Sequence, residues 1–156
     1  MNWNQEIQDV GKLAVAFALA LPVGWYRERE AHSVGVRTFP IVAIASCGFI
    51  LLCGGWGRPS MDAQSRVLQG IAAGIGFVGA GAILKSESHV RGTATAASIW
   101  NIAAMGAAVA FDHYLIAIFL ASMNFITLRV LLPVKKAIDQ NEEELPASPA
   151  KPNPDG

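Results

Sequence analysis

The chain has 156 residues, of which 53% are hydrophobic and 15% are charged, and its formal net charge at pH 7 is zero. Soluble domains carry about 25% charged residues and a smaller apolar share, so this composition is typical of a membrane protein. A chain without net positive charge also lacks the basic surface of a nucleic-acid-binding protein, and we expect no nucleic acid among its partners.

Five apolar runs, interrupted by almost no charge, follow one another along the sequence. A helix rises about 1.5 Å per residue, so a run of about 20 residues crosses the hydrocarbon core of a bilayer. A soluble domain of this length cannot bury five such runs. We therefore predict an all-α fold, a polytopic membrane helix bundle with about five transmembrane helices, over residues 1–136. The runs are 10–26, 39–57, 67–84, 92–111 and 114–128.

The first run, 10–26, is flanked by charged residues on both sides. Glu6 and Asp9 precede it, unlike the positive start of a cleaved signal peptide, so we expect a retained helix. Arg27 and Glu28 follow it directly, at a boundary where charges are costly to hold near hydrocarbon. A pair that folds back into the bundle is one interpretation of these two residues, and a solvated loop is the other.

The third run, 67–84, is rich in glycine. Small residues four apart let helix backbones approach closely in a membrane. Because the glycines fall on more than one helix face, we predict that this run is a central helix contacted on several sides. The bulkier runs 39–57 and 114–128 are then expected to face lipid. The predicted helix-packing residues are Gly70, Gly74, Gly76, Gly79 and Gly81.

Two similar segments precede the second and the fourth run. Arg37 is followed by Thr38, and Arg91 is followed after one glycine by Thr93, so each threonine is a candidate N-cap. Helix N-termini and nearby arginines both favour anions, so an anion site is one interpretation and anchoring at the membrane surface is the other. The offset of 54 residues (91 minus 37) also indicates two parallel repeats, which commonly place a site at their interface.

Asn101 is an amide inside the fourth run. In hydrocarbon its side chain needs a polar partner, so we expect it to join two helices or to contact a ligand. Asp62 and Asp112 are single carboxylates predicted on the outer side, whereas Mg²⁺ sites usually combine carboxylates with retained waters. The sequence thus defines no catalytic residue, cofactor or metal ligand. Mg²⁺ stays open as a ligand or substrate, and we expect no enzymatic activity.

Positive charge lies mainly in alternate loops. The cations after the first, third and fifth runs outnumber those on the opposite side, which predicts an outer N-terminus and an inner C-terminus. The stretch 137–156 carries acidic residues and repeated prolines, so we expect a disordered cytoplasmic tail. The cations assigned to the inner side are Arg27, Arg29, Arg37, Lys85, Arg91, Arg129, Lys135 and Lys136.

Four segments together resemble the membrane domain of the MgtC/SapB family. They are Gly24-Trp-Tyr-Arg27-Glu28, Gly35-Val-Arg37-Thr38, the glycine-rich stretch 70–81, and the stretch from Val90-Arg91-Gly92-Thr93 to Trp100. Their order and spacing cover residues 10–108. The family-like positions are Arg27, Glu28, Arg37, Gly74, Gly76, Gly79, Gly81, Arg91, Gly92, Thr93, Thr95 and Trp100.

The resemblance implies a multi-pass protein of the bacterial inner membrane that is linked to magnesium limitation and, in pathogens, to survival inside host cells. Members are viewed as regulators that bind other membrane proteins, and the family is also labelled as a Mg²⁺ transporter. Some members carry a cytoplasmic C-terminal domain, which we do not expect here. Two functions stay open: a regulator that docks on a membrane-protein partner or on itself within the lipid, and a carrier of Mg²⁺ or another solute.

Overall fold

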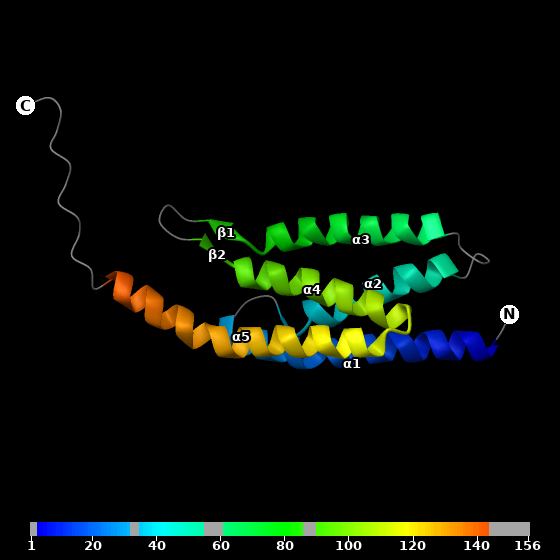
Figure 1. Ribbon diagram of the computed structural model, residues 1–156, viewed down its shortest axis with the longest axis horizontal. Coiled ribbons are helices and arrows are strands. Elements are labelled where there is room, and N and C mark those ends of the chain that lie inside the picture. Colours follow the sequence, from blue (N-terminus) through cyan, green and yellow to red (C-terminus); the bar gives the residue numbers. More distant parts are fainter. Residues whose placement is uncertain (1–2, 32–34, 55–60, 86–89, 144–156) are drawn as a thin grey trace, which may run out of the picture.

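The computed structural model describes residues 3–31, 35–54, 61–85 and 90–143. These residues form five helices that alternate in direction along one long axis, with a two-stranded antiparallel hairpin near one end (Figure 1). The predicted all-α membrane bundle is confirmed. The elements are α1 (Trp3–Ala31), α2 (Thr38–Gly54), α3 (Met61–Gly81), β1 (Leu84–Lys85), β2 (Val90–Arg91), α4 (Thr93–Ala110) and α5 (Tyr114–Glu143).

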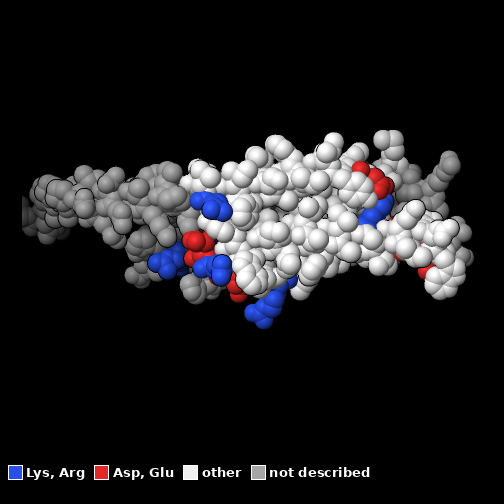
Figure 2. Space-filling model, turned by 90° about the horizontal axis from the view of Figure 1, so that it is seen from below, with Lys and Arg blue, Asp and Glu red and all other residues white. Residues whose placement is uncertain are grey.

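Within the described ranges, three helices are long and apolar enough to cross a membrane. They are Trp3–Glu30, Thr93–Ala110 and Tyr114–Leu131. α2 is apolar but shorter, with 17 residues, and α3 begins with a polar segment that contains Asp62 and Arg66. On the face that Figure 2 draws, a broad band of uncharged atoms separates charged residues toward the two ends. Such a band suits a bundle whose middle lies in hydrocarbon, since charges there are costly.

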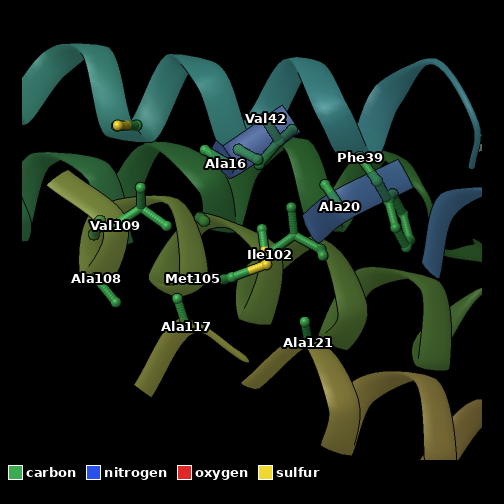
Figure 3. Packing of buried hydrophobic residues seen from close by; sticks show 14 of the residues in the cluster. Ala16, Ala20, Phe39, Val42, Ile102, Met105, Ala108, Val109, Ala117 and Ala121 are labelled. Atoms are coloured by element: carbon green, nitrogen blue, oxygen red, sulfur yellow. The ribbon is translucent and has the colours of Figure 1, made fainter. Parts of the chain in front are cut away.

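The core is formed by α1, α2, α4 and α5, with α4 at its centre (Figure 3). In α4, 56% of the apolar stretch is buried, against 22% in those of α1 and α5, so α4 is the helix that its neighbours surround. Its Gly106 lies so close to α2 that a side chain there would overlap the Ala43 carbonyl. The labelled core residues in Figure 3 are Ala16, Ala20, Phe39, Val42, Ile102, Met105, Ala108, Val109, Ala117 and Ala121.

α3 lies at the edge of the bundle, so the prediction of a central glycine-rich helix is wrong. Among its residues only Gly79 is buried, and a Cβ at Gly79 would meet Ala96 of α4 at 3.4–3.7 Å. Small residues permit close approach without specifying a partner, and the small residues of α4 fill the central position instead. The predicted packing positions at which a Cβ would meet open space among the described residues are Gly70, Gly74, Gly76 and Gly81.

The other two packing predictions had different outcomes. α2 was expected to face lipid, yet it buries Phe39, Ala43 and Cys47 completely against the rest of the core. Over residues 114–131, where its side chains are described, α5 exposes most of its apolar side chains, as predicted, and Leu115 is 84% exposed.

The last helix runs further than the apolar pattern predicts. α5 ends at Glu143, so residues 137–143 are helical although the composition assigns them to a disordered tail. An apolar run marks the part of a helix that lies in hydrocarbon, and it carries no signal for where the helix ends in water. Residues 144–156 lie outside the described ranges.

Candidate functional site

The backbone of α1 at Gly24 contacts the backbone at Gly35, three residues before α2 begins, and we call this close approach the α1–α2 crossing. A Cβ on Gly24 would lie 2.8 Å from the Gly35 carbonyl oxygen, and one on Gly35 would lie 2.6 Å from that of Gly24. Beside this crossing, the Val36 N–H donates to Glu28 Oε2 at 3.0 Å. The Phe39 N–H donates to the Gly35 carbonyl at 3.0 Å as α2 begins. The Glu28 carboxylate therefore closes the turn that leads into α2.

Arg27 points inward from α1 to the first turn of α4. Its Nε and Nη2 both donate to Thr95 Oγ1, at 2.9 and 2.5 Å. Arg27 is 9% exposed and Thr95 is 2% exposed, so the contact is enclosed. The interpretation in which the arginine folds back into the bundle is confirmed, but its partner is Thr95 rather than the neighbouring Glu28. Among the described residues, no carboxylate lies within ion-pair distance of this guanidinium.

α4 begins at a turn that only glycine can form. Gly92 has φ of 89°, and a Cβ there would overlap the Ala82 carbonyl. Gly92 is also the N-cap, and it supplies no side-chain hydrogen bond to the first turn. The predicted N-cap Thr93 is instead the first helical residue and is exposed. The N-cap position falls to glycine because the chain enters α4 in the left-handed region, which favours a residue without a Cβ.

Arg37 directly precedes α2, Arg91 ends β2 and Arg27 is near the end of α1; these three chain segments lie toward the same end of the bundle (Figure 1). Arg37 and Arg91 are exposed, and neither makes a side-chain hydrogen bond or ion pair to another residue of the described ranges. The structure thus brings together Arg27, Glu28 and Thr95 with the turn glycines, and it does not join Arg37 to Arg91. A shared anion site of these two arginines stays a prediction.

α4 and α5 each carry an amide inside an apolar run, Asn101 and Asn124, and the sequence analysis singled out only Asn101. Ser98 Oγ donates to Asn124 Oδ1 at 2.9 Å, and Asn124 Nδ2 donates to the Ser98 carbonyl at 3.4 Å. Asn101 is half-buried, and its enclosed Oδ1 has no hydrogen-bond partner in the part of the chain described. The inter-helix contact expected of Asn101 is therefore made by Asn124. The sequence could have predicted this role for Asn124, since it is an amide in an apolar run and needs a polar partner there.

An ion pair ties α1 to the α4–α5 turn at the opposite end. Lys12 Nζ lies 2.7 Å from Asp112 Oδ2 and also donates to the Ala110 carbonyl at 3.2 Å. The hydrogen bond from Lys12 holds the pKa of Asp112 below its usual value. The two outer carboxylates do not converge, because Asp62 pairs with Arg66 on α3. In the searched ranges, no three His, Cys, Asp or Glu side chains are grouped so as to hold a metal ion.

These contacts define the class of the protein: a helical membrane bundle whose enclosed polar groups join one helix to another. The chain belongs to the MgtC family, whose sequence profile matches residues 13–137. It is 33% identical over 129 residues to protein SrpB of Synechococcus elongatus, which covers 75% of this chain and 71% of SrpB. The resemblance seen in the sequence motifs is confirmed.

Two further relatives are longer than this chain. Identity to protein MgtC of Brucella abortus is 35% over 141 residues, or 86% of this chain and 57% of that protein. Identity to protein SapB of Bacillus subtilis is 30% over 138 residues, or 83% and 58%. The chain therefore spans a little more than half the length of these relatives. No solved structure matches it.

Proposed function

We propose that this protein is a multi-pass protein of the bacterial inner membrane that acts in magnesium homeostasis by binding another membrane protein. Membership of the MgtC family supports the magnesium link. The proposal of a partner comes from the structure of one helix, α3. Except for Gly79, its glycines have no described atom within 4 Å of their Cβ positions, so they are not used for packing on the described residues.

Three of the four unused glycines of α3 share one side of the helix, and Gly76 lies on another. Residues advance by about 100° each around a helix, so Gly70, Gly74 and Gly81 fall on one face. Gly79, which packs on α4, lies on the opposite side. Phe77 falls on the glycine side and is 85% exposed. We call Gly70, Gly74, Phe77 and Gly81 the glycine face.

A groove adjoins this face. It lies between α2 and α3, has a volume of about 480 Å³, and is lined by Gly70 and Gly74 together with apolar side chains such as Ile41 and Phe49. In lipid, helices associate through close van der Waals packing at small residues. A transmembrane helix of a partner fits this surface, because it can approach the α3 backbone closely and fill the groove with its side chains.

Capture from mild detergent tests the proposal. Gly74→Leu places a bulky side chain on the glycine face, where no described atom lies within 4 Å of a Cβ, so the fold should persist. We expect a reproducible partner of the wild type to be lost. Gly76→Leu is the matched control, since it adds the same side chain in open space on another face and should retain the partner. The proposal would be overturned if the wild type captures no partner, or if both variants lose the partner to the same extent. If the captured protein is a second copy of this chain, the partner on the glycine face is that copy.

The magnesium link has its own test. Growth of a deletion strain in low magnesium should be restored by the wild type and by Gly76→Leu, and not by Gly74→Leu. The competing function is transport of Mg²⁺. It is tested by measuring Mg²⁺ flux into liposomes that contain the protein and a Mg²⁺-sensitive dye. We expect no flux above that of empty liposomes, since the groove is apolar and the described residues form no cluster of carboxylates.

A further inference from the structure

The Arg27 guanidinium is a buried charge that forms no close ion pair among the described residues, and the nearby Glu30 carboxylate acts on it only at longer range. It is nine-tenths buried, and among the described residues it contacts a neutral hydroxyl and no carboxylate. A guanidinium has five N–H donors, and two of them are used at Thr95. The other N–H donors of Arg27 have no hydrogen-bond partner among the described residues, so an anion that reaches them would stabilise the buried charge.

The first turn of α4 offers further donors at the same place. The first N–H groups of a helix have no acceptor within the helix, and the N-cap Gly92 has no side chain to supply one. Thr95, the third helical residue, holds the guanidinium directly beside this turn. Thr93 and Ala94 are exposed, so the end of the helix is open to a ligand.

We propose that Arg27 and the first turn of α4 form a binding site for a phosphate group. Phosphate suits both components, because a helix N-terminus presents N–H groups and a positive dipole to its oxygens, and arginine binds it with two parallel hydrogen bonds. The Thr95 hydroxyl accepts from Arg27 and keeps one O–H of its own to donate.

The phosphate has two sources that share this chemistry. Arg91 is exposed just before α4, at the end of the bundle that we predict to lie at the inner headgroup layer. A phospholipid headgroup is therefore one source of the phosphate. Free phosphate is the other. The site lies on α1 and α4, whereas the glycine face lies on α3, so its test is separate from the capture of a protein partner.

The test measures thermal unfolding of the full chain by circular dichroism in phosphatidylcholine nanodiscs. One arm titrates inorganic phosphate against chloride at equal ionic strength, and the other replaces part of the lipid by phosphatidylglycerol. A ligand that binds only the folded state raises the unfolding midpoint with concentration. We expect such a rise in at least one arm. Arg27→Lys keeps the charge but loses the planar fork, and should weaken the apparent affinity about tenfold.

Arg29→Lys is the matched control, because Arg29 is exposed on the same helix and stacks 5.6 Å from the Trp25 ring. It should change the affinity by less than about twofold, as expected for a screened surface charge. A rise with phosphatidylglycerol alone identifies a lipid headgroup, and a rise with inorganic phosphate alone identifies the free anion. Equal effects of the two variants would overturn the proposal. If Arg27→Lys misfolds, two measurements on the wild type replace it: equilibrium dialysis with labelled phosphate, and lipid retention by native mass spectrometry. The absence of saturable binding of both phosphate and lipid would also overturn the proposal.

Discussion

Replacing Gly24 by alanine should weaken the packing of α1 against the start of α2, because the added methyl group has no room. A Cβ there would lie 2.8 Å from the Gly35 carbonyl oxygen and 3.3 Å from Phe39 Cβ, so Gly24→Ala must displace backbone. We expect the free energy of unfolding to fall by about 1–3 kcal/mol, the usual cost of overpacking. Thermal unfolding in detergent measures it.

Gly11→Ala is the control for Gly24→Ala. Gly11 lies in the same helix, and no described atom lies within 4 Å of its Cβ position. Alanine is favoured over glycine inside a helix by about 0.5–1 kcal/mol, so this variant should be slightly stabilised. Shifts of the same sign in both variants would show that the crossing tolerates a side chain.

Thr95→Val tests the buried contact of Arg27. Valine keeps the shape of threonine but leaves Nε and Nη2 without their acceptor. We expect a loss of about 1.5–3 kcal/mol, typical of a hydrogen bond to a charged group. Thr93→Val, at the exposed start of α4, should stay within about 0.5 kcal/mol of the wild type. Unfolding by urea in detergent measures the free energy of unfolding of both variants. Equal losses in Thr95→Val and Thr93→Val would mean that the contact between Arg27 and Thr95 does not stabilise the fold.

Residue-level interpretation of the sequence succeeded where a charge met a hydrophobic boundary. The cost of a charge near hydrocarbon left two interpretations of Arg27 open, a solvated loop and a fold back into the bundle, and the structure shows the second. The identity of its partner there was not predictable, since Thr95 lies 68 residues further along the chain. The cap prediction for Thr93 failed because the left-handed backbone of Gly92 is set by its contact with Ala82, a tertiary feature.

Between elements, the Lys12–Asp112 ion pair makes a predictable contribution to pH dependence. The hydrogen bond from Lys12 lowers the folded-state pKa of Asp112. The resulting stabilisation is complete above the unfolded pKa of aspartate, about 3.9, and is lost as the pH falls through the lower folded-state value. Unfolding midpoints measured from neutral pH downward should therefore decline in this acid range.

Asp112→Asn should remove that part of the decline. Asparagine keeps an acceptor for Lys12 and tolerates the positive φ of 62° at this position, so the turn is preserved. The size of the effect is modest, because the Asp112 side chain is 62% exposed. An unchanged acid decline in Asp112→Asn would assign the pH dependence to other groups.

The number, order and class of the helices followed from the apolar runs and their lengths, but which helices are neighbours did not. α3 and α4 are both rich in small residues, and only the structure shows that α4 is central and α3 peripheral. Small residues remove a steric barrier to contact without adding an attraction for one partner over another. The alanines of α4 meet α1, α2 and α5, whereas α3 keeps the glycine face unused.

For the whole molecule, charge is distributed unequally between the two ends of the bundle. The end of α1 and the hairpin lie at one end of the bundle, and the start of α2 lies toward that end (Figure 1). These segments carry Arg29, Arg37, Lys85 and Arg91. The opposite end combines Lys12 and Arg66 with carboxylates of α1, α3 and the α4–α5 turn. Among the described residues, these cations thus lie toward one end of the bundle, as the sequence predicted for the loops on its inner side.

This asymmetry predicts the orientation of the bundle. The end rich in lysine and arginine should face the cytoplasm, with the N-terminus outside. In intact cells, a membrane-impermeant maleimide should label Asp62→Cys, whereas Arg37→Cys should react only after the membrane is permeabilised. Both positions are exposed, and the native cysteines are buried at Cys47 and half-buried at Cys53, so the wild type measures the background. The reverse labelling pattern would invert the topology, and it would move the phosphate site proposed at Arg27 to the outer leaflet.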